Sequence, residues 1–361
     1  MKRLTLGDVC KKASSNIAQK DLQDKMGVYP IYGASGLIKQ VDFYQQDKEY
    51  IAVVKDGAGI GRTMLLPAYS SVIGTMQYLL PKEGIPIDIK YLFYAVEHMN
   101  LAKYFSGATI PHIYFKDYQK EPINIPDIDT QRKISRIFDK IDALIASRKE
   151  QRTKLDQIVK SRFIELFGDT PDNEKQTMAD ICKIITDGTH QPPKFTSTGV
   201  PFLFVSNIVT NEIHYDAEKF ISEETYAELT KRTPIAIGDI LLSTVGSYGH
   251  PAIVKSDKPF CFQRHIAYLK PNADMVNSEY LRSAILSADV QRQIDERVKG
   301  IAQKTLNLSE IRKLRLPVPP VDQQEQFAAF VAQTDKSKLA IEKSLDKLEI
   351  LKKALMQKYF G

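Results

Sequence analysis

Hydrophobic residues recur every three or four positions along residues 130–168, which is the spacing of an amphipathic helix. No proline or glycine interrupts this stretch before Gly168, so the pattern predicts one continuous helix roughly 57 Å long. Most helices of globular proteins have three or four turns, and one this long needs a long partner to cover its hydrophobic stripe. The last stretch of the chain, residues 322–361, has a similar length and a similar pattern.

The two long stretches are related by an internal duplication. A shift of 193 positions places Gly168 on Gly361, and matching residues then recur along both stretches without a gap. The matched pairs include Pro126 with Pro319, Asp129 with Asp322, Gln131 with Gln324, Asp142 with Asp335, Leu155 with Leu348 and Phe167 with Phe360. The same shift holds upstream as far as Gly107 and Gly300, so we expect two copies of one architectural unit.

Short runs rich in β-branched and aromatic residues, separated by glycine and proline, precede each long stretch. They predict a mixed α/β (α+β) fold with two globular domains. The expected order is a first globular domain at 1–125, a long spacer helix at 126–168, a second globular domain at 169–316 and a second spacer helix at 317–361. Within the domains, single helices are expected at 89–105 and 278–299.

The two long helices are expected to pack on each other as an antiparallel coiled coil that separates the two domains. The residues expected at their interface are Ile134, Ile137, Ile141, Leu144, Leu155 and Ile158 in the first helix, and Phe327, Phe330, Ile341, Leu348, Leu351 and Leu355 in the second. Polar residues interrupt both stripes, so two helices of an ordinary helical subdomain remain the alternative.

The composition, 43% hydrophobic and 26% charged, is typical of a soluble globular protein. No apolar run approaches the ~20 residues of a membrane span, and the N-terminus lacks an apolar signal segment, so we expect a cytoplasmic protein. Cys10 and Cys182 lie in matching contexts and are expected to be buried at equivalent places. The net charge is +6, but residues 169–316 carry −1, so any polyanion contact there needs a local basic patch.

No catalytic or metal-binding pattern stands out. The six histidines lack the spacing of a metal site, and the sequence has neither a Walker loop nor a G-x-S-x-G motif. The glycine-rich segment from Gly57 to Gly61 leads into a strand-like run instead of a helix, which favours a β-turn over a dinucleotide-binding loop. We therefore expect a chain that is not itself an enzyme and that binds no metal.

Several loops combine small polar, aromatic and basic groups, which suit contacts with base edges and phosphates. The candidate DNA-contacting residues are Tyr32, Ser35, Lys55, Arg62 and His112 in the first domain, and Thr189, His190, Gln191, Lys194, Asn207, Ser247, Tyr248, Arg264 and His265 in the second. Arg232 is a weaker candidate, because it lies in a Lys-Arg-Thr turn typical of a solvated surface. Taken alone, each loop also fits a structural turn.

Taken together and in this order, these features resemble the specificity subunit of type I restriction–modification systems, the HsdS family. The stretches that carry the resemblance are Y-P-I-Y-G-A-S-G-L-I at 29–38, D-G-T-H at 187–190, V-P-F-L-F-V-S-N-I at 200–208 and G-D-I-L-L-S at 238–243. A proline-led start of a long helix, used twice, adds to them. The resemblance covers essentially the whole chain.

The resemblance implies two target recognition domains, each of which reads one half of a bipartite DNA site, and a helix pair that sets the spacer and docks two modification (methyltransferase) subunits. Restriction/translocase subunits join in some complexes. S-adenosylmethionine, ATP and Mg²⁺ are then expected on the partner subunits, and this chain is non-catalytic. The alternative function is a two-headed protein scaffold or a stand-alone DNA-binding protein. DNA binding that sharpens when methyltransferase subunits are added separates these alternatives.

Overall fold

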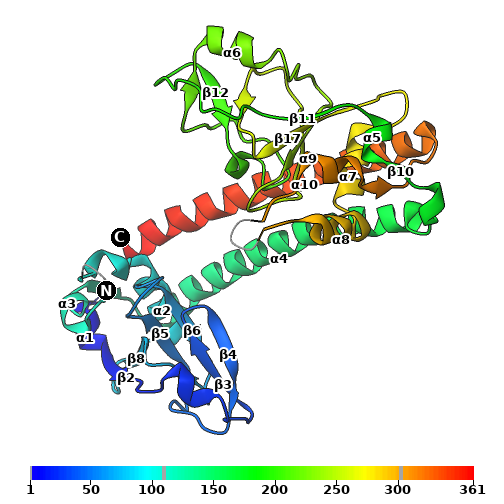
Figure 1. The fold of residues 1–361 in the computed structure, drawn as a ribbon. Helices are drawn as coiled ribbons and strands as arrows, with labels where there is room; N and C mark the ends of the chain where they lie inside the picture. The colour runs from blue at the N-terminus through cyan, green and yellow to red at the C-terminus, as the bar shows by residue number, and fades with distance from the viewer. Residues whose placement is uncertain (1, 108–110, 301–303) are drawn as a thin grey trace. The chain divides into compact units, whose positions relative to one another are not determined.

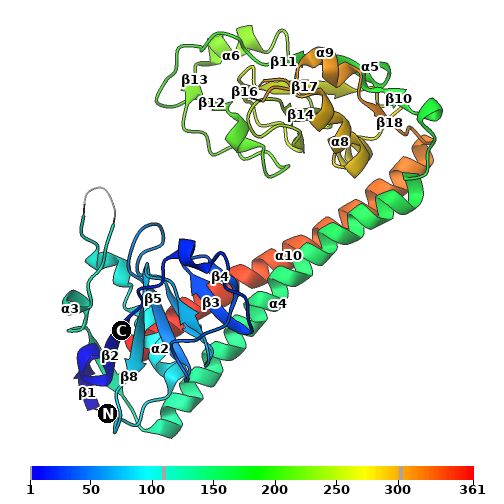
Figure 2. The same ribbon diagram turned by 60° about the horizontal axis from the view of Figure 1, so that its bottom comes forward.

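The computed structural model describes residues 2–107, 111–300 and 304–361, and it divides into two compact units (Figures 1 and 2). Unit 1 comprises residues 1–150 and 342–361, and unit 2 comprises residues 151–341. Two helices of 40 residues, α4 (Ile128–Phe167) and α10 (Val321–Phe360), contribute to both units. The units therefore cut across the predicted domain boundaries, because each one contains a globular domain together with one half of each long helix.

The globular domain of unit 1 contains three small sheets. A four-stranded antiparallel sheet has the order β2-β8-β5-β6, a three-stranded sheet has the order β4-β3-β7, and β1 pairs with β9. The strands are β1 (Lys2–Thr5), β2 (Cys10–Ser14), β3 (Tyr29–Gly33), β4 (Gly36–Val41), β5 (Tyr50–Val54), β6 (Thr63–Leu66), β7 (Ser71–Val72), β8 (Met76–Pro81) and β9 (Pro122–Ile125). The helices are α1 (Leu6–Val9), α2 (Ile89–His98) and α3 (Phe115–Tyr118), with 3₁₀ turns η1 (Gln19–Leu22) and η2 (Leu101–Tyr104).

The globular domain of unit 2 repeats this plan. Its sheets have the orders β11-β17-β14-β15, β13-β12-β16 and β10-β18. The strands are β10 (Gln176–Thr177), β11 (Cys182–Asp187), β12 (Val200–Leu203), β13 (Phe220–Ile221), β14 (Ile240–Ser243), β15 (Pro251–Ile253), β16 (Cys261–Phe262), β17 (Ile266–Pro271) and β18 (Arg315–Leu316). The helices are α5 (Met178–Ile181), α6 (Glu223–Leu229), α7 (Ser278–Ile285), α8 (Ala288–Arg297) and α9 (Leu308–Arg312), with 3₁₀ turns η3 (Asp172–Glu174) and η4 (Val205–Asn207).

The duplication predicted from the sequence is confirmed strand by strand. The four-stranded sheets have the same order and the same antiparallel pairings. Each three-stranded sheet combines one antiparallel and one parallel pair. The mixed α/β fold class is likewise confirmed. The glycine-rich segment joins β5 to β6 as a turn between antiparallel strands, as predicted, and Gly57, Gly59 and Gly61 all have positive φ.

Unit 1 packs the start of α4 against the end of α10. The ring centroids of Phe138 and Phe360 are 5.7 Å apart, and Lys352 Nζ lies 2.9 Å from the Asp142 carboxylate. Tyr91 of α2 joins the same cluster, with its ring 5.2 Å from that of Phe360. Contact positions rise along α4 while they fall along α10, so the two helix segments run antiparallel within this unit.

Unit 2 packs the end of α4 against the start of α10 in the equivalent way. The rings of Phe167 and Phe327 are 5.7 Å apart, and Lys338 Nζ lies 2.7 Å from Asp156. Tyr280 of α7 takes the place of the α2 tyrosine, with its ring 5.0 Å from that of Phe167. In both units, therefore, an aromatic cluster joins the globular domain to a pair of antiparallel helix segments.

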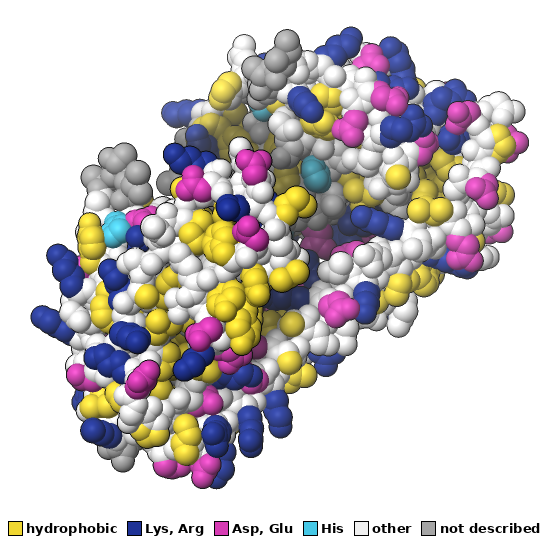
Figure 3. All heavy atoms as spheres, turned by 90° about the horizontal axis from the view of Figure 1, so that it is seen from below, with side chains coloured by type: hydrophobic (Ala, Val, Ile, Leu, Met, Phe, Trp, Pro, Cys, Tyr) yellow, Lys and Arg dark blue, Asp and Glu magenta, His cyan; other side chains and the backbone are white. Residues whose placement is uncertain are grey.

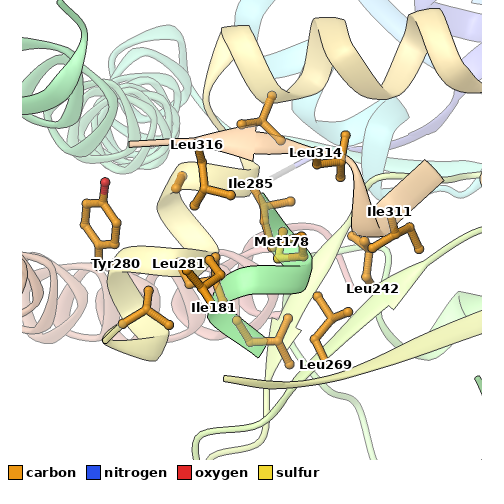
Figure 4. Packing of buried hydrophobic residues seen from close by; sticks show 14 of the residues in the cluster. Met178, Ile181, Leu242, Leu269, Tyr280, Leu281, Ile285, Ile311, Leu314 and Leu316 are labelled. Atoms are coloured by element: carbon orange, nitrogen blue, oxygen red, sulfur yellow. The ribbon is translucent and has the colours of Figure 1, made fainter. Parts of the chain in front are cut away.

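The core of unit 2 shows how the helices cover the sheet (Figure 4). Apolar side chains from α5, α7, α9, β14, β17 and β18 point toward one another in this view. The labelled residues are Met178, Ile181, Leu242, Leu269, Tyr280, Leu281, Ile285, Ile311, Leu314 and Leu316, and all are fully buried. Burial of this set supplies the main driving force that holds the helices on the sheet.

The two domain helices differ from their predictions. The expected helix at 89–105 ends at His98, because Asn100 adopts a left-handed conformation with φ of 49° and a 3₁₀ turn follows. The expected helix at 278–299 is split into α7 and α8, because Ser287 acts as an N-cap and accepts a hydrogen bond from Val290 N at 3.3 Å. Both breaks come from local backbone capping that hydrophobic spacing does not reveal.

The seam between the long helices follows a slightly different line from the predicted one. Among the predicted residues Ile134, Ile141 and Phe327 are buried, and Ile137, Leu155, Phe330, Ile341, Leu348 and Leu355 are partly buried. Leu144, Ile158 and Leu351 are instead 46–49% exposed.

The difference between the predicted and the observed seam has a simple geometrical cause. With 3.6 residues per turn, positions three and four residues ahead both lie near a helix seam. The prediction took the residue three ahead, whereas in the structure the more buried one lies four ahead: Phe138 after Ile134, Val159 after Leu155, and Val331 after Phe327.

The two matched cysteines occupy equivalent positions, as predicted, at the first residues of β2 and β11. Cys10 is buried, but Cys182 is partly exposed, so the expectation of burial holds fully only for the first. Burial raises the pKa of each thiol to about 12.

Candidate nucleic-acid interface

Three loops and one extended arm meet at one end of the four-stranded sheet of unit 2. The loop after β11 accepts a hydrogen bond at Thr189 O from Arg264 N, at 3.1 Å. Thr244, after β14, donates its N–H to His265 O at 3.0 Å, and its own carbonyl accepts from Leu306 N at 2.8 Å. The strand ends, the turn at 262–265 and the arm at 304–306 thus form one continuous site, which contains five of the predicted residues: Thr189, His190, Gln191, Arg264 and His265.

This site is hollowed on both sides of Asp187. One cavity of about 400 Å³ lies against Thr244, Arg264, His265 and Asn307. A second, of about 210 Å³, lies against the 188–190 segment and Arg232. Polar side chains on both sides of a shared carboxylate can offer donors and acceptors to the edge of a base.

Asp187 organises the rim of these cavities. Its Oδ2 lies 3.0 Å from His190 Nε2, its Oδ1 lies 3.6 Å from Arg232 Nη2, and its side chain is only 13% exposed. Arg232 Nη2 also donates to Thr186 Oγ1 at 3.3 Å. The carboxylate therefore holds two potential phosphate or base contacts in place, and Arg232 has a defined position in the site even though its turn suggested only a solvated surface.

Arg264 and His265 form a second polar pair. Arg264 Nε donates to His265 Nε2 at 3.3 Å, and the arginine is exposed while the histidine is partly buried. Burial, helped by the positive charge of Arg264, holds the pKa of His265 below its usual value. A neutral imidazole fits this geometry, because its Nε2 must accept the arginine N–H.

The remaining predicted residues of unit 2 have different roles. Tyr248 donates its hydroxyl to Asp295 at 2.9 Å, and Ser247 is exposed in the turn beside it. Lys194 is exposed farther along the loop that begins at Thr189. Asn207 is structural: its Oδ1 accepts from Phe204 N at 2.9 Å and its Nδ2 donates to two carbonyls of the loop that follows η4.

Unit 1 builds an equivalent site with different side chains. Ile113 N donates to Lys55 O and Gly57 N donates to Pro111 O, both at 3.0 Å, as Leu306 and Gly246 do in unit 2. The glycine-rich loop is fixed to the β3–β4 turn by Arg62, whose Nη1 donates to Ala34 O at 2.9 Å. This bond leaves the guanidinium exposed at the surface beside Ser35.

The other predicted residues of unit 1 lie in or beside this loop. His112 Nδ1 pairs with the Asp56 carboxylate, and Lys55 Nζ lies 3.6 Å from the same carboxylate. The imidazole also lies 4.1 Å, centroid to centroid, from the ring of Tyr114. Tyr32 differs, because its side chain packs against the hydrophobic cluster beneath the three-stranded sheet and is partly buried.

The sequence prediction omitted Asp187 and Asn307 as site residues. Asp187 belongs to the D-G-T-H stretch, and its place at the end of a strand was a usable signal. Asn307 follows the arm that lies against the β14–β15 loop, and the repeat shift pairs it with Tyr114. The shift does not reach Asp187, and Tyr114 is not itself a candidate, so the duplication alone points to neither residue.

Charge of both signs is spread over one face of the structure. On the face shown in Figure 3, Lys and Arg side chains alternate with Asp and Glu instead of forming one continuous basic patch. Within the described ranges no helix combines the length and apolar character needed to cross a membrane. Over the same residues, no three His, Cys, Asp or Glu side chains are grouped so that they could hold a metal ion.

Comparison with known proteins gives the family. The sequence profile of the type I restriction modification DNA specificity domain matches residues 1–157 and again residues 171–352. The chain belongs to this family. The two matches coincide with the two copies of the duplicated fold, so each globular domain with the helix that follows it is one family domain.

Curated relatives have low sequence identity to this chain, but the matches cover most of it. A type I restriction enzyme specificity subunit of Methanocaldococcus jannaschii is 20% identical, over 85% of this chain and 77% of the relative. A putative specificity subunit of Haemophilus influenzae is 21% identical, over 94% of this chain and 92% of the relative. The EcoBI specificity subunit of Escherichia coli is 22% identical, and the match spans only 61% of that relative.

Solved structures share the fold. The S subunit of a type I restriction-modification system from M. genitalium aligns over 100% of this chain and 96% of its own, with 17% identity and a TM-score of 0.57. A chain from a study of complex assembly and conformational transition in the type I R-M system aligns over 99% and 97%, with 14% identity and a TM-score of 0.58.

Proposed function

We propose that this chain is the DNA specificity subunit of a type I restriction–modification complex, in which each globular domain reads one half of a bipartite site. The observation that carries the proposal is that both globular domains, which match the same family profile, contain an equivalent candidate site. In both units an arm and a β-turn loop are hydrogen-bonded to each other at the same end of the same sheet.

The side chains of the two sites support different half-sites. Unit 1 presents Arg62, Lys55 and His112, whereas unit 2 presents Arg264, His265 and the carboxylate of Asp187. Arginine favours guanine, and an acidic side chain accepts from cytosine. A common scaffold with different side chains therefore gives one protein two unlike recognition surfaces.

The proposal extends to partners. The helix pair links the two readers, sets the spacer and docks two methyltransferase subunits, and the relation between the repeats suits two identical partners on a single chain. Restriction and translocase subunits join in some complexes. S-adenosylmethionine, ATP and Mg²⁺ belong to those partner subunits, and this chain contributes recognition and assembly without a chemical step of its own.

The test is single-molecule methylation sequencing of cells that express this chain with and without its methyltransferase. We expect a split motif, two short half-sites around an unread spacer, only when both proteins are expressed. Specific DNA binding by the purified chain should also sharpen when the methyltransferase is added. An active methyltransferase that modifies no split motif in the presence of this chain would rule the proposal out.

A further inference from the structure

Each long helix has a buried glutamine in its first turn that is hydrogen-bonded to the adjoining globular domain. Gln131 in α4 and Gln324 in α10 are related by the duplication, and both are fully buried. They are polar residues inside an apolar environment, where an unpaired amide is costly. Their hydrogen bonds show why the position is polar in both copies.

In unit 1, Gln131 Oε1 accepts from Asp88 N at 2.8 Å, and its Nε2 donates to Pro86 O at 3.0 Å and to Pro126 O at 2.9 Å. Pro86 and Asp88 belong to the segment that leads into α2, and Asp88 is the N-cap of that helix. Pro126 lies just before α4. One side chain therefore ties the domain, the turn and the long helix together.

Unit 2 repeats the three bonds with different neighbours. Gln324 Oε1 accepts from Asn277 N at 2.9 Å, and its Nε2 donates to Met275 O at 3.0 Å and to Pro319 O at 2.7 Å. Asn277 is the N-cap of α7. The backbone N–H on one side and the two carbonyls on the other fix the orientation of each amide, because an N–H can only donate and a carbonyl can only accept.

A tyrosine makes a second link at each joint. Tyr91 donates its hydroxyl to Asn124 O at 2.6 Å, and Tyr280 donates to Pro317 O at 2.8 Å. Both acceptors lie in the segment that leads into the long helix. The hydrophobic burial at these joints is non-directional, whereas hydrogen bonds have preferred distances and angles. The amide and the hydroxyl therefore define the angle of the joint.

We propose that Gln131 and Gln324 are positioning residues that fix the angle between each recognition domain and its long helix, and that they thereby determine which spacer length the protein accepts. This inference rests on the proposed function. One added base pair moves a half-site about 3.4 Å along DNA and turns it by about 35°. A joint held by three directional bonds resists a rotation of that size, and a joint held by apolar contacts alone accommodates it.

The test compares Gln131→Met and Gln324→Met with Gln293→Met in the full chain with its methyltransferase. Gln293 is a matched control, because it is also a buried glutamine with three side-chain bonds, but two of these connect α8 to β18 and the third stays within α8, all inside one globular domain. The measurement is the ratio of methylation at sites with spacers one base pair longer or shorter to methylation at the wild-type spacer.

We expect each joint variant to raise this ratio about tenfold, which corresponds to about 1.4 kcal/mol of lost discrimination. The control should lower total methylation at most, because reduced stability removes active protein without changing spacer preference. Tyr91→Phe removes one hydroxyl and keeps the ring. It should raise the same methylation ratio by a smaller factor, about threefold. This variant tests the inference if a glutamine variant does not fold.

Hydrogen exchange on the isolated full chain supplies a measurement that needs no DNA. The Asp88 amide should exchange at least about tenfold faster in Gln131→Met, because its acceptor is lost. Unchanged spacer preference in the folded joint variants would overturn the inference while leaving the proposed function intact. If the wild-type chain produces no split motif, the proposed function fails and the spacer inference falls with it.

Discussion

Phe167→Ala tests the idea that an aromatic cluster joins each globular domain to the helix pair. Phe167 is 5% exposed, and its ring lies 5.2 Å from Phe163, 5.0 Å from Tyr280 and 5.7 Å from Phe327, centroid to centroid. Truncation of a buried phenylalanine to alanine costs about 3–5 kcal/mol. Because a domain is stabilised by only about 5–15 kcal/mol, this change should bring unit 2 close to unfolding.

The assay is native-state hydrogen exchange of the full chain, since a chain with two units has no single unfolding free energy. The opening free energy of the slowest amides in β17 should fall by about 3–5 kcal/mol. The amides of β8 in unit 1 should change less, because effects on separate clusters add nearly independently.

Phe360→Ala is the matched control, because Phe360 occupies the equivalent position in unit 1 but is partly exposed. Its ring lies 5.2 Å from Tyr91 and 5.7 Å from Phe138. Less buried surface is lost there, so the fall in β8 should stay below about 3 kcal/mol. An equal or larger loss from Phe360→Ala would refute the reasoning from burial.

Two further predictions follow from the ionisable groups. Burial raises the pKa of Cys10, Cys182 and Cys261 to about 12, so at pH 8 iodoacetamide should label these thiols much more slowly in the native chain than in the unfolded chain; rapid labelling of the native protein would contradict this. Burial and the neighbouring arginine lower the pKa of His265 below 6.5 in the folded chain. As the pH falls, the unfolded chain therefore binds this proton before the folded chain does, so the stability of unit 2 should fall below about pH 6.5. His265→Gln should make that fall shallower in chemical denaturation at pH 7 and pH 5, and an unchanged slope would count against it.

The long helices and the duplication could be predicted from the sequence. Hydrophobic periodicity is visible within a single segment, and a gap-free repeat is found by comparing the sequence with itself. The loops that carry the candidate site could also be predicted, since glycine and small polar residues mark the turns between strands. Of the single residues, Arg62 and Arg264 lie at these sites, whereas Asn207 and Tyr32 serve the fold.

What could not be predicted depends on contacts between distant segments. The seam of the helix pair required knowing which of two adjacent helix positions faces the partner, and Phe138 rather than Ile137 is the more buried. The role of Gln131 required knowing that residues 86–88 lie beside the start of α4. Asp187 gained its role from Arg232, which lies 45 positions away in the sequence.

The most direct test of the central claim compares the methylation motifs of Arg62→Ala and Arg264→Ala, each expressed with the methyltransferase. A lost base contact costs about 1–3 kcal/mol of discrimination. We therefore predict that Arg62→Ala relaxes one or two positions in one half-site, that Arg264→Ala relaxes positions in the other half-site, and that the spacer stays unchanged in both. If both variants alter the same half-site, or if both weaken methylation uniformly without a change in sequence preference, the assignment of one half-site to each unit is wrong.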